Sequence, residues 1–265
     1  MKTSIFVTLY KYRSLLFELV IREFTGRYRG TFGGIAWSFA QPLFLLAVYT
    51  LAFGVILKAR WGYTGDTKAY SLILFAGLIV FNTFSECLKR APTLITSNPN
   101  LVKKVIFPLE ILPVVMVITS IIHLLISLGI WFAGYIVLFG FPQSTSLYLF
   151  FVLGAFAPIL LGIGWLLAAL GVVVRDIDQL FGLVSQVFLF LTPIFFSIDA
   201  APRILQKVFL LNPLTFIVEQ LRQALFFGIN PNFKGLTTYF FLATIFSTIS
   251  LYFFRRLQPT FGDLV

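Results

Sequence analysis

Charged residues are scarce in this 265-residue chain, and cysteine and histidine are almost absent. Charged residues make up 11% of the chain and hydrophobic residues 59%, whereas soluble domains carry about 25% charged residues. A soluble fold of this length could not bury so many apolar side chains. A lone cysteine, Cys87, excludes an intrachain disulfide and a metal cluster built on cysteines. These absences predict that lipid solvates most of the chain.

The sequence also lacks a Gly-rich loop ending in Gly-Lys-Ser or Gly-Lys-Thr. Such a loop supplies the backbone N–H groups and the lysine that hold nucleotide phosphates. We therefore expect no catalytic site, no metal and no cofactor in this chain. If ATP drives it, ATP and Mg²⁺ must bind to a separate ATPase subunit.

What the sequence does contain is six apolar runs, most of them as long as the roughly 20 residues with which a helix crosses a bilayer. An open strand edge cannot lie in lipid, so the runs predict an all-α integral membrane protein with a single domain over residues 1–265. The predicted spans are 33–57, 70–90, 111–139, 147–173, 179–198 and 236–254.

The formal charge of +10 comes from basic residues that lie mostly outside the apolar runs. We interpret them as residues that set topology and contact anionic phospholipid, and expect no nucleic-acid partner. Six crossings with both termini in the cytoplasm would place 13 of the 20 Lys and Arg residues inside and 7 outside. This distribution favours cytoplasmic termini. Glu86 and Glu110 lie near cytoplasmic ends of spans, where we expect them to pair with Lys or Arg.

Residues 4–24 precede the first span and differ from it. Lys11, Ser14, Glu18 and Arg22 recur three or four residues apart and form one polar stripe on a helix, opposite a broad apolar face. This pattern predicts a helix that lies in the membrane interface. A ragged extension of the first span is the alternative.

The segment 199–235 contains two short apolar stretches, 203–211 and 214–227, with Asn-Pro between them. Together they predict a re-entrant hairpin at the outer mouth of a pore, because irregular backbone at membrane depth needs protein or water beside it. Two helices lying flat on the outer surface are the alternative. The gate candidates are Asn212, Pro213, Glu219 and Arg222.

An ATPase subunit would have to act on a cytoplasmic loop, and the loop between the second and third spans is the best candidate. Ser97 or Asn98 can cap a short helix there, with Pro99 in its first turn. Lys103 and Lys104 would lie near its C-terminal end, where the helix dipole favours cations. An ordinary topogenic loop is the alternative. The predicted coupling element comprises Asn98, Pro99, Asn100, Leu101, Val102, Lys103 and Lys104.

Several short motifs occur in order along nearly the whole chain. They are Arg27-Tyr28-Arg29-Gly30-Thr31 followed by Gly34, Trp37 and Pro42-Leu43; Asn98 to Lys104 with Phe107-Pro108; Arg175-Asp176-Ile177; Thr192-Pro193-Ile194; and Asn212-Pro213-Leu214 followed by Glu219 and Arg222. Taken together, the motifs resemble the polysaccharide-export permeases of ABC transporters, which export O-antigen, capsule or teichoic acid.

The resemblance implies a homodimer of six-helix permeases in the bacterial plasma membrane, joined to two ATPase subunits. It implies that lipid-linked polysaccharide passes from the cytoplasm to the outer face. It also implies an N-terminal interface helix, a coupling helix after the second span and re-entrant helices at the outer mouth. An ABC exporter of drugs or small lipids is the nearest alternative, since its scaffold would be almost the same.

Polar side chains within the spans are candidates for the translocation path. Gln179, Gln186 and Pro193 are seven residues apart on the fifth span, and polar groups in a span usually face protein or water. Amides and hydroxyls suit a hydroxyl-rich polymer, although hydrogen bonding between helices is the alternative. Aromatic rings on the first span could stack on sugars. The path candidates are Tyr49, Phe53, Gln179, Gln186, Thr192 and Pro193.

Two other classes of protein fit less of the sequence. Asp176-Ile177-Asp178 has the form of a glycosyltransferase metal motif, but the inner loops are too short to build a nucleotide-sugar site. A proton-coupled carrier needs ionisable groups within its spans, and His123 alone qualifies. We interpret His123 as bonded to a neighbouring helix.

Overall fold

The computed structural model describes residues 4–61, 67–103, 107–174 and 176–264, and these residues form helices and turns without any strand. The α-helices are α1 (Ile5–Lys11), α2 (Arg13–Gly26), α3 (Trp37–Tyr49), α4 (Thr67–Arg90), α5 (Pro99–Val102), α6 (Ile111–Phe139), α7 (Leu149–Val173), α8 (Ile177–Leu191), α9 (Arg203–Leu211), α10 (Pro213–Arg222), α11 (Phe233–Leu257) and α12 (Phe261–Leu264). Two π-helical segments, η2 (Thr50–Ile56) and η5 (Gln223–Phe227), extend α3 and α10. The 3₁₀ segments are η1 (Gly34–Ala36), η3 (Ser144–Tyr148), η4 (Ile198–Ala200) and η6 (Gln258–Thr260).

Five helical segments among the described residues are long and apolar enough to cross a membrane. They are Gly34–Ile56, Lys68–Arg90, Ile111–Phe139, Ser144–Val173 and Phe233–Thr260. Each overlaps one of the predicted spans, and the prediction of an all-α membrane protein is confirmed. A sixth crossing would require α9 and α10 with η5 to count as one span, and this pair is bent by 95°.

The fifth predicted span, 179–198, differs from the helix found there. With 15 residues, α8 is about 22 Å long, which is shorter than the roughly 30 Å hydrocarbon core. The helix ends at Leu191 because Pro193 has no N–H to donate and disfavours helical backbone at the residue before it. Thr192 is accordingly extended, with ψ 133°. The count of six crossings stays a prediction.

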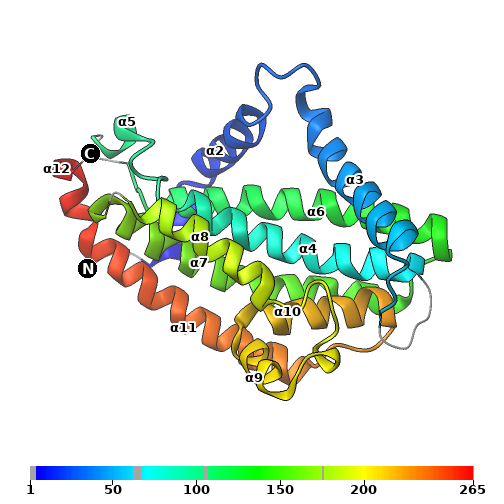
Figure 1. Ribbon diagram of the computed structural model, residues 1–265. Coiled ribbons are helices and arrows are strands. Elements are labelled where there is room, and N and C mark those ends of the chain that lie inside the picture. The colour runs from blue at the N-terminus through cyan, green and yellow to red at the C-terminus, as the bar shows by residue number, and fades with distance from the viewer. Residues whose placement is uncertain (1–3, 62–66, 104–106, 175, 265) are drawn as a thin grey trace.

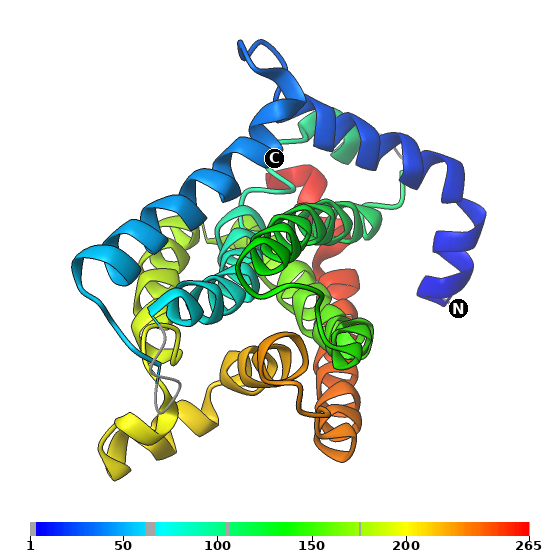
Figure 2. The same ribbon diagram turned by 90° about the vertical axis from the view of Figure 1, so that its right-hand side faces the viewer.

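The centre of the bundle is α4, with 89% of its apolar window buried against 11% for the window that covers α3. Viewed along the helices, α3 and α8 lie on one flank of the bundle, and α1 and α2 lie on another (Figure 2). Buried polar contacts fix α4 to its neighbours: Trp131 Nε1 of α6 donates to the Leu72 carbonyl at 2.8 Å. Close packing also joins α7 to α11, where a Cβ on Gly162 would lie 2.5 Å from Phe246.

The predicted interface helix is two helices, α1 and α2, which break at Tyr12. The apolar face of α2 packs on protein, because Leu19 and Val20 form a buried cluster with Ile111 and Val115 of α6. The same two helices also carry exposed large apolar residues, among them Phe6, Tyr10 and Phe17. Such residues on a helix pair beside a membrane bundle suit the lipid interface that the sequence predicts.

Both ends of the described chain lie at the same end of the bundle, together with α5 and α12 (Figure 1). The bent pair of α9 and α10 lies away from this end, beside α8 and the start of α11. We refer below to these two regions as the terminal end and the bent-pair end.

Candidate functional site

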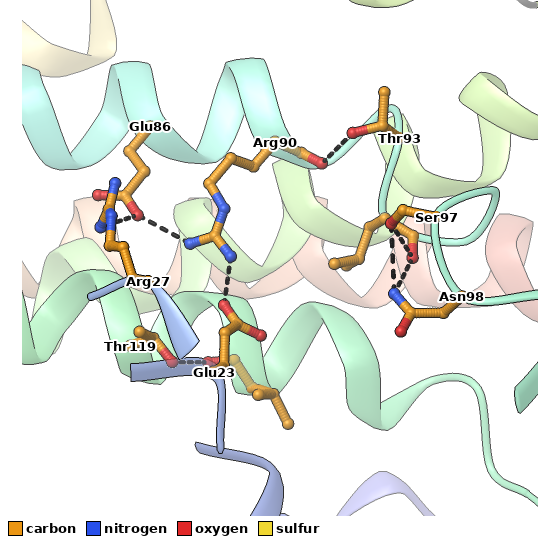
Figure 3. Close-up of polar contacts among 10 residues, drawn as sticks. Glu23, Arg27, Glu86, Arg90, Thr93, Ser97, Asn98 and Thr119 are labelled. Atoms are coloured by element: carbon orange, nitrogen blue, oxygen red, sulfur yellow. Dashed lines mark hydrogen bonds and ion pairs between the residues drawn. The ribbon is translucent and has the colours of Figure 1, made fainter. Parts of the chain in front are cut away.

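Four charged residues at the terminal end form a continuous chain of ion pairs between α2 and α4. Glu86 accepts from Arg27 Nη1 at 2.9 Å and from Arg90 Nη1 at 2.8 Å. Arg90 also donates through Nη2 to Glu23 of α2. Figure 3 shows Glu86 between the two arginines and Arg90 between the two carboxylates. The expectation that Glu86 pairs with basic residues is confirmed, and its partners tie the N-terminal helices to the central helix.

The Arg27-Tyr28-Arg29-Gly30 motif forms the turn that leaves α2. Tyr28 is buried, and its hydroxyl lies 3.3 Å from Nδ1 of His123 on α6. Burial raises the pKa of the Tyr28 phenol, so its hydroxyl keeps its proton. Gly30 adopts a left-handed φ of +80°, which the turn requires. Arg29 is exposed. The contact between Tyr28 and His123 agrees with the prediction that His123 bonds a neighbouring segment.

The predicted coupling element contains a short helix, α5, which begins at Pro99 and lasts four residues. The predicted side-chain cap is wrong: Asn98 Nδ2 donates backward to the Leu94 carbonyl at 2.9 Å, and α5 receives no side-chain cap bond. The same carbonyl accepts from Ser97 Oγ at 3.4 Å, so both predicted capping side chains bond the turn that precedes α5. Lys103 is exposed after α5, while Lys104, like Arg175 of another motif, lies outside the described residues.

The turn before α5 is joined to the ion-pair chain. Thr93 Oγ1 donates to the Arg90 carbonyl at 3.3 Å, so this turn starts on the residue that binds Glu23. A cavity of 290 Å³ separates α2 from this turn, and its wall includes Glu23, Arg90, Ser97 and Asn98. A displacement of α5 would therefore reach Arg90 through one short, hydrogen-bonded turn.

At the bent-pair end, the chain after α8 runs without helical hydrogen bonds, and side chains from other elements bind its carbonyls. Asn212 Nδ2 donates to Leu191 at 3.1 Å, and Tyr70 Oη donates to Phe195 at 2.6 Å. Arg222 Nη1 and Nη2 donate to the carbonyls of Pro193 and Ile194 at 2.7 and 2.8 Å. Carbonyls left unpaired in lipid would each cost several kcal/mol. These hydrogen bonds satisfy the carbonyls and so make the non-helical segment after α8 possible.

Arg222 is wholly buried at this break. Its Nε also donates to the Ile73 carbonyl of α4 at 3.1 Å, and Nη1 pairs with Glu219 at 2.8 Å. The guanidinium lies 4.4 Å from the ring centroid of Trp61. One side chain thus joins α10, α4 and the break after α8. Such a charge is stable inside a membrane protein only because its donors and its charge are matched.

The four predicted gate residues come together on α10. Asn212 accepts from Leu214 N at 2.9 Å and caps the helix, and Pro213 occupies its first position. Glu219 and Arg222 form an ion pair near the C-terminal end of α10. From the sequence, Arg222 counts among the cations of an outer segment, and its buried site is not predicted. We call this site the Arg222 socket: it is formed by Trp61, Glu219 and the carbonyls of Ile73, Pro193 and Ile194. The signal for that socket was a pair of aromatic residues, Trp61 before the second predicted span and Tyr70 at its start.

The path candidates lie in three environments. Tyr49 and Phe53 are half-buried in an aromatic cluster, with Phe53 5.5 Å from Tyr70 between ring centroids. Gln179 and Gln186 are exposed on α8, on the flank shared with α3. Thr192 and Pro193 are buried in the break, so in this chain their side chains serve the fold.

A second acidic residue, Glu110, joins the start of α6 to the end of α11. Its two oxygens accept from Arg255 Nε at 2.5 Å and Nη2 at 2.8 Å. The Glu110 carbonyl accepts from Trp165 Nε1 of α7 at 3.0 Å. The predicted pairing of Glu110 is confirmed, and its bidentate form is the strong one for arginine.

Residues 14–226 match the family described as ABC-2 type transporter. The chain belongs to this family. The matched stretch of this ABC-2 type transporter runs from α2 into η5, and includes the ion-pair chain, α5 and the Arg222 socket.

Three relatives are similar to this ABC-2 type transporter over most of their length. The O-antigen export system permease protein RfbA of Myxococcus xanthus is 28% identical over 241 residues, covering 87% of this chain and 80% of the relative. RfbA of Klebsiella pneumoniae is 22% identical over 256 residues, covering 94% and 96%. The polysialic acid transport protein KpsM of Escherichia coli is 23% identical over 245 residues, covering 88% and 90%.

Proposed function

We propose that this chain is the membrane-spanning subunit of an ABC exporter that moves lipid-linked polysaccharide from the cytoplasm to the outer face of a bacterial plasma membrane. Relatives named for O-antigen export and polysialic acid transport support this substrate class. ATP and Mg²⁺ bind to two copies of a separate ATPase subunit. Both termini are cytoplasmic, which agrees with their position at the same end of the bundle as α5.

The observation that carries the proposal is the connection of α5 to Arg90. An ATPase that pushes on α5 displaces the turn attached to the Arg90 carbonyl. Arg90 holds Glu23 of α2 and Glu86 of α4, and Glu86 holds Arg27. The push therefore reaches the N-terminal helices and the central helix together. Ion pairs between rigid helices can exist in two discrete arrangements, which a switching element needs.

A second copy of the chain completes the exporter as a homodimer. The flank formed by α3 and α8 is available for it, since α3 exposes Trp37, Phe39 and Phe44. Gln179 and Gln186 are exposed on the same flank, and amides facing lipid would be unfavourable. A partner subunit or a water-filled path beside α8 removes this cost, so we retain both glutamines as path residues.

The test uses the transporter reconstituted in proteoliposomes with its ATPase. In the double variant Pro99→Ala with Lys103→Glu we expect less polysaccharide exported per ATP hydrolysed. The control is Lys207→Glu, which changes an exposed lysine on α9, far from α5. Normal export by the double variant would remove the coupling role of α5. Export of drugs or small lipids, with no export of polysaccharide, would support the alternative substrate class.

A further inference from the structure

A cavity of 380 Å³ lies between the α2–α3 connection, α3, α4 and α6, and extends from Arg90 near the end of α4 to the middle of that helix. We call it the inner cavity. Its wall has an apolar part, which includes Leu45 of α3 and Phe75 and Ile79 of α4. The polar part of its wall includes Arg27, Gln41, Asn82, Lys89, Arg90 and His123. A cavity with one apolar and one polar wall fits an amphiphile better than a wholly polar ion.

The inner cavity has an excess of positive charge. Three cations, Arg27, Lys89 and Arg90, line it together with one carboxylate, Glu86. When Glu23, which is bound to Arg90, is also counted, the net charge is +1. Lys89 is exposed and, within the described part of the chain, forms no ion pair. A cation beside low-dielectric protein attracts an anion more strongly than one in bulk water. The charge that remains is thus available to a ligand.

His123 provides an independent sign of a ligand. Its Nδ1 lies 3.3 Å from the Tyr28 hydroxyl, while its Nε2 is buried and has no hydrogen-bond partner among the described residues. If the Tyr28 hydroxyl donates to Nδ1, the proton of the neutral imidazole is on Nε2. A buried donor without an acceptor costs about 1–3 kcal/mol. Because Nε2 has almost no accessible surface, an oxygen of a ligand would supply that acceptor only after the imidazole turns toward the cavity.

The arginines of the cavity have donors left for such a ligand. A guanidinium has five N–H groups in a planar fork, and within the described part of the chain Arg27 uses one of them, on Glu86. Arg90 uses two, on Glu86 and Glu23. Guanidinium forks bind phosphate bidentately, and lysine binds it as a point charge. This donor set favours phosphate over a neutral headgroup.

We propose that the inner cavity binds the phosphate or diphosphate group of a lipid, with the lipid tail along the apolar wall. Lys89 and Arg27 hold the group, and His123 lies in the same cavity wall. The identity of the lipid as the carrier of the exported polysaccharide rests on the proposed function. The site itself does not depend on it, because a membrane phospholipid presents the same chemistry.

The test measures binding by the full chain alone in phosphatidylcholine nanodiscs, without an ATPase, with farnesyl diphosphate as the probe. We expect Lys89→Gln to weaken binding about tenfold, since a charge-assisted contact is lost, and Lys89→Arg to restore it. The matched control is Lys234→Gln, an exposed lysine at the start of α11, which should bind like the native chain. Size-exclusion profiles identify variants that remain folded.

Competition experiments distinguish the possible sources of the phosphate. Phosphatidylglycerol that displaces the probe at equal concentration assigns the site to membrane phospholipid, and weaker displacement assigns it to a lipid that ends in a diphosphate. Inorganic diphosphate bound as tightly as the probe would overturn a lipid site. Equal binding by Lys89→Gln and the native chain, or an equal loss in Lys234→Gln, would also overturn it. Failure of polysaccharide export would overturn the proposed function and leave this binding result unchanged.

Discussion

A Cβ placed on Gly77 of α4 would lie 2.6 Å from Nη2 of Arg222 on α10. The guanidinium reaches the break after α8 because α4 has no side chain at that point. We therefore predict that Gly77→Ala lowers thermal stability, since Arg222 must release at least one carbonyl, at a cost of about 1–3 kcal/mol. Heating in detergent followed by size-exclusion chromatography measures the change.

Gly129→Ala is the matched control, because a Cβ on this glycine of α6 meets nothing within 4 Å. Alanine also favours a helix by about 1 kcal/mol over glycine, so this control should be as stable as the native chain or more so. If both variants melt like the native chain, the close fit of Gly77 to Arg222 is refuted.

Arg222→Lys tests whether charge alone is sufficient in the socket. Lysine keeps the charge but has one nitrogen, which cannot reach the carbonyls of Ile73, Pro193 and Ile194 together. We predict a loss of about 3 kcal/mol or more, from carbonyls left unpaired in a buried site. Arg203→Lys, at an exposed position on α9, should leave the melting midpoint unchanged. A native midpoint for Arg222→Lys would show that charge suffices.

Glu86→Gln removes the carboxylate shared by Arg27 and Arg90. These pairs are partly exposed, so we expect a modest loss of stability, about 1 kcal/mol. The larger expected effect is a fall in polysaccharide exported per ATP hydrolysed, because α2 and α4 then move separately. Glu18→Gln, an exposed site on α2, is the control for charge. If Glu86→Gln exports as much polysaccharide per ATP as the native chain, the ion-pair chain has no role in coupling.

The bidentate pair of Glu110 and Arg255 predicts a charge-reversal result. Arg255→Glu should destabilise the protein by about 3 kcal/mol, since it places two carboxylates together in a partly buried site. Adding Glu110→Arg should recover part of that loss in a double-mutant cycle. Arg256→Glu, at the exposed neighbouring position, should change stability little. Additive effects of the two reversals would contradict a direct pair.

The single cysteine makes a topology experiment simple. Cys87 is free and fully buried, so we expect no maleimide reaction in the folded protein. In intact cells, Lys234→Cys should react with a membrane-impermeant maleimide, whereas Lys103→Cys should react only after the inner face is opened. Both lysines are exposed. Reaction of Lys103→Cys in intact cells would invert the proposed orientation.

The sequence predicted features that depend on local order along the chain. Apolar length predicted the long helices, and Asn212-Pro213 predicted the start of α10. It failed where contacts from distant segments decide the structure. The sequence around residues 191–195 gives no sign that the side chains of Tyr70, Asn212 and Arg222 donate hydrogen bonds to the carbonyls of this segment. The cap predicted for α5 failed similarly, because Asn98 had two possible partners and bonded the preceding turn.

By itself the sequence determined that the chain is a helical membrane protein, because the free energy of transferring long apolar runs to lipid depends on composition and length alone. It also placed the ionisable residues at the ends of the helices. Only the tertiary structure decided which of these charges meet, as Glu86 meets Arg27 and Glu110 meets Arg255. Ion pairs and buried hydrogen bonds depend on distances of a few ångströms between segments far apart in the chain, and those distances are fixed only when the helices pack.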